Sequence, residues 1–267
     1  MKNFLSRFYT ALCFLFLYAP ILILIVFSFN ADKGLTWTGF TTKWYGELIR
    51  NETVINSFVN TMIVAVVASV AATVLGTTAA FGIHAMKKHA KGAMRTLTYI
   101  QILNPEIVTG ISLMLLFTYF KLSSGFVTLI LAHITFCVPT VVLSVQPKLR
   151  QMNVSLYEAA MDLGCNRVQA FMKVVVPEIL PGILSGFLMA LTYSIDDFVI
   201  SYFTSGTTSQ TLPVVIYSMT KKQVTPTIYA LSTIMFVAVL AVLIIYNMID
   251  VRFENEKQKA LNAAKKA

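Results

Sequence analysis

Long apolar stretches alternate with short polar segments along the whole chain. A helix that crosses the hydrocarbon core of a bilayer needs about 20 mostly apolar residues. The stretches that meet this length are 8–30, 56–83, 97–120, 126–146, 181–203 and 227–249. Four of them contain no Asp, Glu, Lys or Arg, whereas Glu106 interrupts the third, and Asp196 and Asp197 interrupt the fifth. The pattern predicts an all-α membrane protein with six transmembrane helices, in a single domain over residues 1–267.

The composition supports a chain embedded in a membrane. Of the 267 residues, 57% are hydrophobic and 12% are charged, and the mean hydropathy is +0.72. An average soluble domain is about 45–50% apolar and about 25% charged. These values exclude a soluble enzyme, and the high hydrophobicity also excludes an intrinsically disordered chain.

The distribution of Lys and Arg predicts how the spans are oriented. The formal net charge is +9, and 15 of the 21 Lys and Arg fall in the inner segments if the N-terminus is cytoplasmic. Because excess positive charge stays on the cytoplasmic side, we expect a multi-pass protein with both termini in the cytoplasm. No basic and aromatic cluster indicates nucleic-acid binding, and no GxxxxGK[ST] phosphate loop is present. A nucleotide site, if one is used, therefore lies on another chain.

The cysteine and histidine residues give no pattern of a metal site or a disulfide framework. Cys13, Cys137 and Cys165 are far apart in the sequence and form no CxxC pair. The histidines are isolated from one another, and we expect His133 to be a hydrogen-bonding residue of the helix bundle. The sequence therefore predicts no metal and no cofactor in this chain.

The cytoplasmic segment between the fourth and fifth spans, residues 147–180, has the signals of ordered structure. Ser155-Leu156-Tyr157-Glu158 has the pattern of a capping box, which starts a helix. Gly164 is placed to end that helix in a left-handed conformation. Asn166 can cap a second helix, which we expect to stop before Pro177. The segment therefore predicts a helix, a glycine turn and a second helix.

The spacing within this loop is specific. Glu158-Ala159-Ala160, three residues, Gly164, nine residues and Val174-Val175-Val176-Pro177 resembles the EAA signature of permeases of binding-protein-dependent ABC importers. That signature reads E-A-A, three residues, G, nine residues and I-x-L-P, so the only departures are two valines. The resemblance implies a type I ABC importer permease with a MetI-like fold and a coupling helix that contacts a cytoplasmic ATPase. The implied coupling residues are Glu158, Ala159, Ala160, Gly164 and Pro177.

Further stretches extend the resemblance over nearly the whole chain, to the spermidine/putrescine permeases. They are 39–45 (GFTTKWY), 133–139 (HITFCVP), 158–164 (EAAMDLG) and 194–197 (SIDD). The resemblance implies a polyamine importer of the bacterial inner membrane, in which this chain forms half of the pathway. Its implied partners are a PotB-like second permease, a PotA-like ATPase dimer and a PotD-like periplasmic binding protein. The ATPase would bind ATP and Mg²⁺, so this chain would have no catalytic site of its own.

Carboxylates at membrane depth are costly and point to function. Glu106 follows Asn104-Pro105, where the missing amide of proline leaves backbone carbonyls available along a cavity. On a continuous helix Asp196 and Asp197 would lie about 100° apart. Asp197 would share a face with polar residues one turn away, so we slightly favour it for substrate contact. Trp44 could stack on an ammonium group. The predicted pathway residues are Asp196, Asp197, Glu106, Trp44, Tyr193 and Ser194.

Other interpretations of these features stay open at this point. The carboxylates could pair with Lys or Arg of a partner subunit or form hydrogen bonds within the bundle, and Trp44 could be a membrane anchor. The same machine could carry iron(III), sulfate, molybdate or a small cationic solute, although carboxylates repel anions. A secondary transporter or channel, or an intramembrane aspartyl hydrolase, would be a different class of protein. Adjacent carboxylates on one helix diverge, which disfavours the hydrolase.

Overall fold

The computed structural model describes residues 2–33, 36–222, 226–241, 243–244 and 248 of the chain. Within these residues the backbone is helical or irregular, and apart from one isolated bridge between Asn30 and Phe40 no β-pairing occurs. The prediction of an all-α fold is confirmed. The chain divides into two compact units, Ser57–Val214 and Met1–Asn56 with Val215–Ala267, and each is described by itself.

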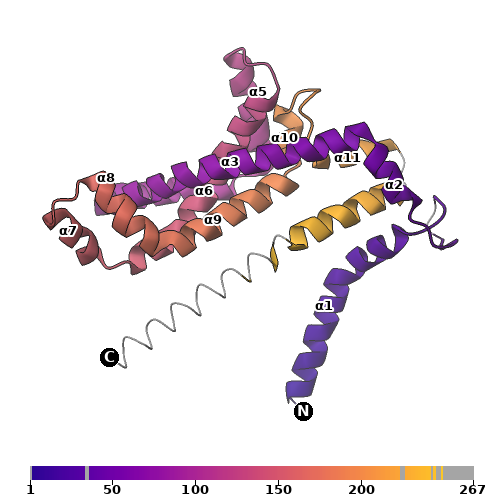
Figure 1. Ribbon diagram of the computed structural model, residues 1–267, viewed down its shortest axis with the longest axis horizontal. Helices are drawn as coiled ribbons and strands as arrows, with labels where there is room; N and C mark the ends of the chain where they lie inside the picture. Colours follow the sequence, from indigo (N-terminus) through magenta and orange to yellow (C-terminus); the bar gives the residue numbers. More distant parts are fainter. Residues whose placement is uncertain (1, 34–35, 223–225, 242, 245–247, 249–267) are drawn as a thin grey trace. The chain divides into compact units, whose positions relative to one another are not determined.

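Long helices that lie side by side form the centre of the Ser57–Val214 unit (Figure 1), namely α3 (Glu52–Ala85), α6 (Phe126–Gln151) and α9 (Val176–Asp196). Glycines allow the close approach of their backbones. A Cβ atom at Gly186 on α9 would lie 3.3 Å from the Cα of Val141 on α6, and one at Gly76 on α3 would lie 2.6 Å from the Cβ of Val141. The packing of these three helices therefore converges on the middle of α6.

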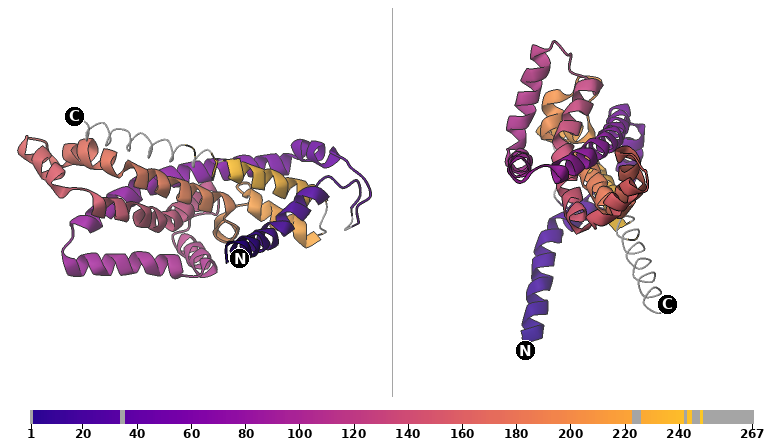
Figure 2. Two further views of the ribbon diagram at one scale, coloured as in Figure 1. Left: turned by 90° about the horizontal axis from the view of Figure 1, so that it is seen from below. Right: turned by 90° about the vertical axis from the view of Figure 1, so that its left-hand side faces the viewer.

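The third predicted span is not one straight helix. It consists of α4 (Lys88–Leu103) and α5 (Glu106–Tyr119), which meet at an angle of 101° (Figure 2). Between them, Asn104 has an extended backbone with ψ of 132°. A residue before proline avoids the helical conformation, and Pro105 has no amide hydrogen to continue the helix. The expectation of a single helix over 97–120 is corrected accordingly.

The fifth predicted span differs at both ends from the expected 181–203. Its helix ends at Asp196, and a separate short helix, α10 (Val199–Thr204), follows the break. At the other end, helical backbone already begins with α8 (Arg167–Ala170) and continues into α9. The segment thus contains a break where the apolar pattern predicted continuity.

Helical backbone also runs through Pro177, so the expected stop before this proline is wrong. A π-helical turn, Phe171–Val175 (the π turn), joins α8 to α9. The N–H of Val176 donates to the carbonyl of Phe171 in the wider hydrogen-bonding pattern of such a turn. In a regular α-helix the proline ring would clash with the carbonyl four residues earlier. We attribute the tolerance of Pro177 to the wider turn directly before it.

The other unit contains α1 (Lys2–Phe27), the short helix α2 (Lys43–Arg50), most of α11 (Leu212–Lys222) and the apolar helix Pro226–Ala241. The buried Asn30 organises the loop after α1. Its amide group donates to the carbonyls of Asp32 and Thr36 and accepts the N–H of Thr38 at 2.9 Å. The Asn30 side chain thus bonds to three backbone groups of the segment that follows α1.

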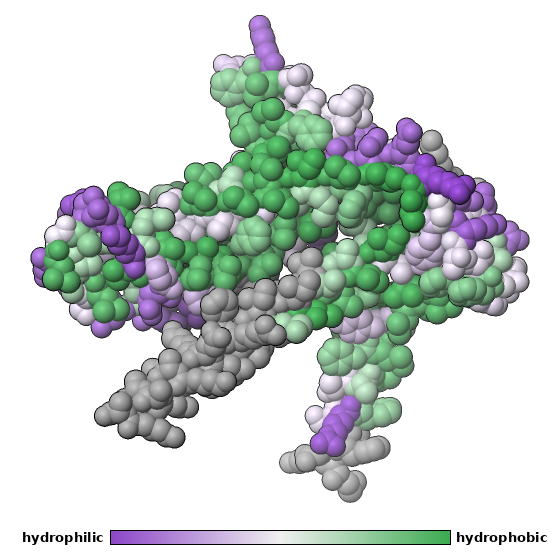
Figure 3. Space-filling model, viewed as in Figure 1, coloured by the Kyte–Doolittle hydropathy of each residue, from purple (hydrophilic) through white to green (hydrophobic). Residues whose placement is uncertain are grey.

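In the described part of the chain, four helices are long and apolar enough to cross a membrane, and a fifth span results if α4 and α5 count as one. They are Ser6–Phe27, Glu52–Ala85, Phe126–Gln151 and Arg167–Asp196. Of the sixth predicted span, 227–249, the apolar helix Pro226–Ala241 is described, and most of the rest lies outside the described residues. In the Ser57–Val214 unit, apolar surface covers α3, and hydrophilic residues gather at the α7 and α8 end (Figure 3).

Candidate functional site

The break between α4 and α5 places Glu106 at a helix start. Pro105 caps α5 and has no N–H of its own to leave unsatisfied. The side-chain amide of Asn104 donates to the hydroxyl of Thr109 at 2.8 Å, which ties the break to the first turn of α5. Glu106 is exposed in that turn. The partial positive charge of the helix N-terminus favours a carboxylate at this position.

The break between α9 and α10 is formed by Asp197. Its backbone leaves the helix, with φ of −62° and ψ of 122°. One carboxylate oxygen accepts the N–H of Ile200 at 3.2 Å, and the other accepts the N–H of Ser201 at 2.7 Å. Both N–H groups belong to the first turn of α10, where a helix supplies no partners. Asp197 therefore follows the end of α9, and its carboxylate accepts the otherwise unpaired N–H groups at the start of α10.

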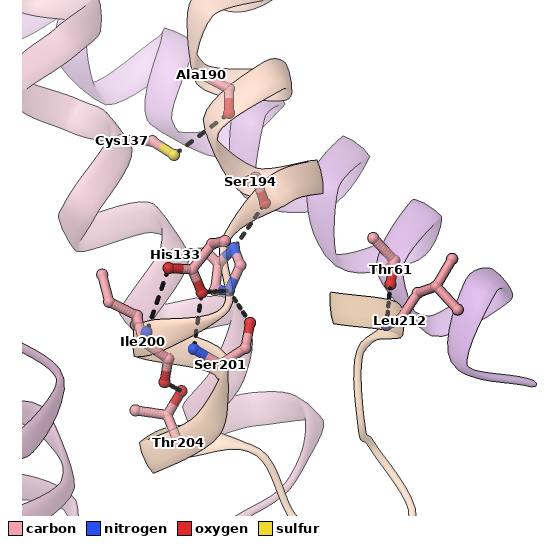
Figure 4. Close-up of polar contacts among 10 residues, drawn as sticks. Thr61, His133, Cys137, Ala190, Ser194, Ile200, Ser201, Thr204 and Leu212 are labelled. Atoms are coloured by element: carbon pink, nitrogen blue, oxygen red, sulfur yellow. Dashed lines mark hydrogen bonds and ion pairs between the residues drawn. The ribbon is translucent and has the colours of Figure 1, made fainter. Parts of the chain in front are cut away.

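An imidazole from α6 joins the two sides of this break (Figure 4). His133 Nδ1 lies 2.6 Å from the hydroxyl of Ser194 on α9. His133 Nε2 lies 3.0 Å from the hydroxyl of Ser201 on α10 and 3.5 Å from the carboxylate of Asp197. All four residues are at most 7% exposed, and we call them the His133 cluster. The expectation that His133 forms hydrogen bonds within the bundle is confirmed.

Asp196 lies in different surroundings from its neighbour Asp197. It is exposed, and α5, which begins at Glu106, is packed against α10, because a Cβ atom at Gly110 would lie 3.5 Å from the Cα of Ile200. The assumption that both aspartates occupy one continuous helix is wrong, because α9 ends between them. The preference for Asp197 over Asp196 depended on that assumption. Of the three carboxylates predicted for the pathway, Asp196 and Glu106 are exposed, and we call these two the acidic pair.

The other predicted pathway residues have separate environments. Tyr193 is 40% exposed, and its ring centroid lies 6.2 Å from that of Phe136. Ser194 is buried in the His133 cluster. Trp44 belongs to the other unit, where it is buried and its indole N–H donates to the carbonyl of Asn30 at 2.7 Å. Tyr193 therefore presents exposed aromatic surface one turn of α9 before Asp196.

The first helix predicted within residues 147–180 is present as α7 (Val154–Asp162), but it begins differently from the expectation. Asn153 is the N-cap, and its side chain accepts the N–H of Ser155 at 3.1 Å. The hydroxyl of Ser155 donates to the same oxygen at 2.7 Å. The predicted capping box at Ser155 and Glu158 is therefore wrong. Asn153 takes the capping position two residues earlier, and Glu158 is left exposed.

The end of α7 agrees with the prediction for Gly164. This residue has a left-handed backbone, with φ of 88°. Its N–H donates to the carbonyl of Met161, and the N–H of Cys165 donates to the carbonyl of Ala160, both at 3.0 Å. This pair of hydrogen bonds is a Schellman motif, which satisfies carbonyls at a helix end. The chain can therefore reverse between α7 and α8.

The second helix of the loop begins as predicted. The side chain of Asn166 accepts the N–H of Gln169 at 2.8 Å, and the side chain of Gln169 accepts the N–H of Asn166 at 3.1 Å. These reciprocal bonds form a capping box. Phe81 on α3 then contacts α7 and the π turn, with ring centroids 5.9 Å from Tyr157 and 4.7 Å from Phe171. The loop is thus a folded unit attached to the bundle through aromatic rings.

The loop exposes several large apolar side chains. Ala160 is buried, whereas Glu158 and Ala159 are exposed. The exposed large apolar side chains of the loop are Val154 (49%), Leu156 (48%), Leu163 (87%), Val168 (71%) and Met172 (57%). Exposed apolar patches of this kind mark sites of protein interaction.

Within the described residues no group of three or more His, Cys, Asp and Glu could hold a metal ion. Cys13, Cys137 and Cys165 are free thiols.

Sequence reasoning did not find the His133 cluster or the π turn. His133 and Ser201 are 68 residues apart, and no local pattern connects them. A signal for the N-cap was present, since Asn153 is as good a capping residue as serine.

Comparisons with known proteins give consistent matches. The family model of the "Binding-protein-dependent transport system inner membrane component" matches residues 72–255. The chain is 38% identical over 251 residues to the spermidine/putrescine transport system permease protein PotC of Haemophilus influenzae, with 92% of this chain and 98% of that protein covered. It is 36% identical over 261 residues to the putrescine transport system permease protein PotI of Escherichia coli K12, covering 95% and 93%.

Solved structures share the fold at lower sequence identity. A chain of a bacterial ABC transporter for import of the acidic polysaccharide alginate matches with a TM-score of 0.73 and 13% identity, covering 94% of this chain and 96% of that one. A chain of the MetNI methionine ABC transporter matches with a TM-score of 0.57 and 15% identity, covering 76% and 98%. The chain therefore has the fold of an ABC importer permease.

Proposed function

The chain belongs to the family of binding-protein-dependent transport system inner membrane components, and from this premise we propose that it is the permease subunit of an ATP-driven importer of polyamines. The observation that supports this cargo is the acidic pair, because Asp196 and Glu106 are exposed carboxylates at the end of α9 and at the start of α5, and α5 packs against the short helix α10 that follows α9. The names of relatives at 36–38% identity support the same cargo.

The chemistry of the acidic pair suits a flexible polycation. Each ammonium group of a polyamine can pair with one carboxylate while the next group still keeps its water. Tyr193 presents an aromatic ring one turn from Asp196, where a cation–π contact adds to binding. Asp197 and Ser194 support the site by holding the break between α9 and α10. Trp44, the predicted pathway residue of the other unit, is not used in this proposed site. An anionic cargo is disfavoured, since carboxylates repel it.

The α7–α8 loop supplies the connection to an ATPase. The apolar side chains that it exposes, together with Ala159 and Glu158, form a surface for a groove on a cytoplasmic partner. Gly164 and Pro177 shape the loop at the turn and at the start of α9. ATP and Mg²⁺ are bound by a PotA-like ATPase dimer in this proposal, and the chain itself has no catalytic site. A PotB-like permease provides the other half of the pathway, and a PotD-like periplasmic protein delivers the cargo.

The same proposal gives the orientation in the bacterial inner membrane. Lys and Arg are concentrated in the segments that include the α7–α8 loop, and such segments remain cytoplasmic. Both termini then lie in the cytoplasm, on the side of the ATPase.

Uptake of labelled spermidine tests the cargo. The chain is expressed with the second permease, the ATPase and the binding protein, in cells that lack their own polyamine import. We expect saturable uptake that putrescine competes and that omission of this chain abolishes. Absence of uptake by the assembled complex would contradict a polyamine cargo and would direct attention to iron(III) or another cation.

Neutralising the acidic pair tests the proposed site. Glu106→Gln and Asp196→Asn each remove one charge from the path of the cation, so each is expected to raise the uptake KM about 10-fold, which corresponds to about 1.4 kcal/mol. The matched control is Glu178→Gln, because Glu178 is an exposed carboxylate at the opposite end of α9. Equal effects at Glu178 and Asp196 would argue for a general loss of surface charge.

A further inference from the structure

The break between α9 and α10 is held by a side chain from a third helix. His133 on α6 contacts Ser194 with one ring nitrogen at 2.6 Å and Ser201 with the other at 3.0 Å. Because both nitrogens of a rigid ring are engaged, the separation of the two helix ends is fixed. The α6 helix is itself in close contact with α9, where a Cβ atom at Gly186 would lie 3.3 Å from Val141. The close packing of α6 against α9 therefore fixes the position from which the imidazole extends.

The position of Asp196 depends on this break. Asp196 is the last residue of α9, two residues after Ser194, and the next residue turns inward to bind α10. This change of direction separates the two aspartates, so that Asp197 is buried and Asp196 remains exposed. Glu106 begins α5, which packs against α10, because a Cβ atom at Gly110 would lie 3.5 Å from the Cα of Ile200. A break with a variable angle would let the end of α9 move and would change the distance between the carboxylates of the acidic pair.

We propose that His133 is a positioning residue for cation recognition, which fixes the distance between the Asp196 and Glu106 carboxylates by bridging Ser194 and Ser201. Two carboxylates at a fixed distance discriminate between polyamines by the separation of their ammonium groups. Sites held rigidly by such a supporting shell are more selective than loose ones. His133 thereby contributes to selectivity without contacting the cargo. The inference rests on the proposed polyamine cargo.

Transport kinetics give the first test. His133→Ala is expected to raise the KM for spermidine with little change in Vmax, and to shift the ratio of kcat/KM for spermidine and putrescine at least 5-fold toward 1. Ser194→Ala and Ser201→Ala each remove one end of the bridge and should shift the ratio in the same direction. In an Asp196→Asn background, His133→Ala should cause no further shift, because the residue that it positions has lost its charge.

Cys137→Ala is the matched control. Cys137 lies one turn from His133 on the same side of α6, and its thiol donates to the carbonyl of Ala190 on α9 at 3.5 Å (Figure 4). The substitution removes this one weak hydrogen bond and leaves the helix packing at Gly186 and the contacts of His133 in place, so the selectivity ratio should stay unchanged. An assembled complex whose ratio is unaffected by His133→Ala or by both serine variants would overturn the proposal. An equal shift in the Asp196→Asn background would overturn it as well.

A measurement that needs no cargo separates this inference from the proposed function. The double variant Glu106→Cys/Asp196→Cys, with Cys13, Cys137 and Cys165 replaced by alanine, is treated with bis-methanethiosulfonates of increasing spacer length. We expect the yield of cross-linked protein to be high over a narrow range of spacer lengths when His133 is present. After His133→Ala, the cross-link should form over a broad range of spacer lengths. If the cross-link yield depends on spacer length in the same way with and without His133, the positioning role is overturned, whatever the cargo. A narrow optimum that His133→Ala broadens, in a complex that imports no polyamine, overturns only the proposed function.

Discussion

The α7–α8 loop and the break between α9 and α10 both interrupt helical backbone, but the side-chain contacts that hold them differ greatly in sequence range. In the loop, Asn153, Gly164 and Asn166 bond to groups within a few positions of themselves. At the break, His133 contacts hydroxyls that are 61 and 68 residues away. The loop can therefore keep its shape while it moves as a unit against a partner. The break keeps its shape only while α6 is packed beside it.

This comparison predicts the largest effect at Asp197. Asp197→Ala removes the acceptor of two backbone N–H groups of α10 and the partner of the His133 imidazole, all buried. Leaving a buried hydrogen-bond donor without its acceptor costs about 1–3 kcal/mol, so the loss of the acceptor of two such donors amounts to about 2–6 kcal/mol. We expect a loss of that size in stability, measured by thermal unfolding of the purified complex or by the amount of complex that assembles.

Asp196→Ala is the control for this substitution, because it removes the neighbouring carboxylate from an exposed position. Its effect on unfolding should be small although its effect on uptake is large. Asp197→Asn retains an acceptor and should fall between the two, at about 1–3 kcal/mol. Equal stability of the two alanine variants would remove the distinction between a structural and a pathway aspartate.

A smaller effect is expected at Gly164, where the loop depends on a backbone conformation. The residue has φ of 88°, and a Cβ atom there would meet nothing within 4 Å. Gly164→Ala therefore costs only the strain of a left-handed backbone, roughly 1–2 kcal/mol. Because that strain favours a different turn between α7 and α8, we expect more ATP hydrolysed per cargo molecule imported. The ratio is measured in proteoliposomes that contain the whole importer.

Gly92→Ala makes the same chemical change with the opposite expectation. Gly92 lies within α4, also with nothing within 4 Å of an added Cβ, and has no positive φ. Alanine there should stabilise the helix by about 0.5–1 kcal/mol and leave the coupling ratio unchanged. If both variants alter coupling alike, the conformation of Gly164 is not the cause.

The same difference in range explains how much could be predicted from the sequence. The helical character, the glycine turn at Gly164 and the cap at Asn166 follow from signals that lie next to one another in the chain. The breaks also have local signals, because Asn104 precedes a proline and Asp197 is of a residue type preferred at the start of a helix. Pro177 has an equally strong local signal for a helix end, which the π turn cancels. The contact of Asp197 with His133 joins residues far apart in the chain, and no local pattern indicates it.

The smallest effect tests which residue begins α7. The side chain of Asn153 accepts the N–H of Ser155, whereas the hydroxyl of Ser155 only donates back to Asn153. Loss of an N-cap costs about 1 kcal/mol, so Asn153→Ala should lower stability by that amount. Ser155→Ala should cost a few tenths of a kcal/mol, because Asn153 still caps the helix. Thermal unfolding of the two variants separates these values. A larger loss for Ser155→Ala would restore the capping box that the sequence pattern first indicated, and would mean that α7 begins two residues later than the structure shows.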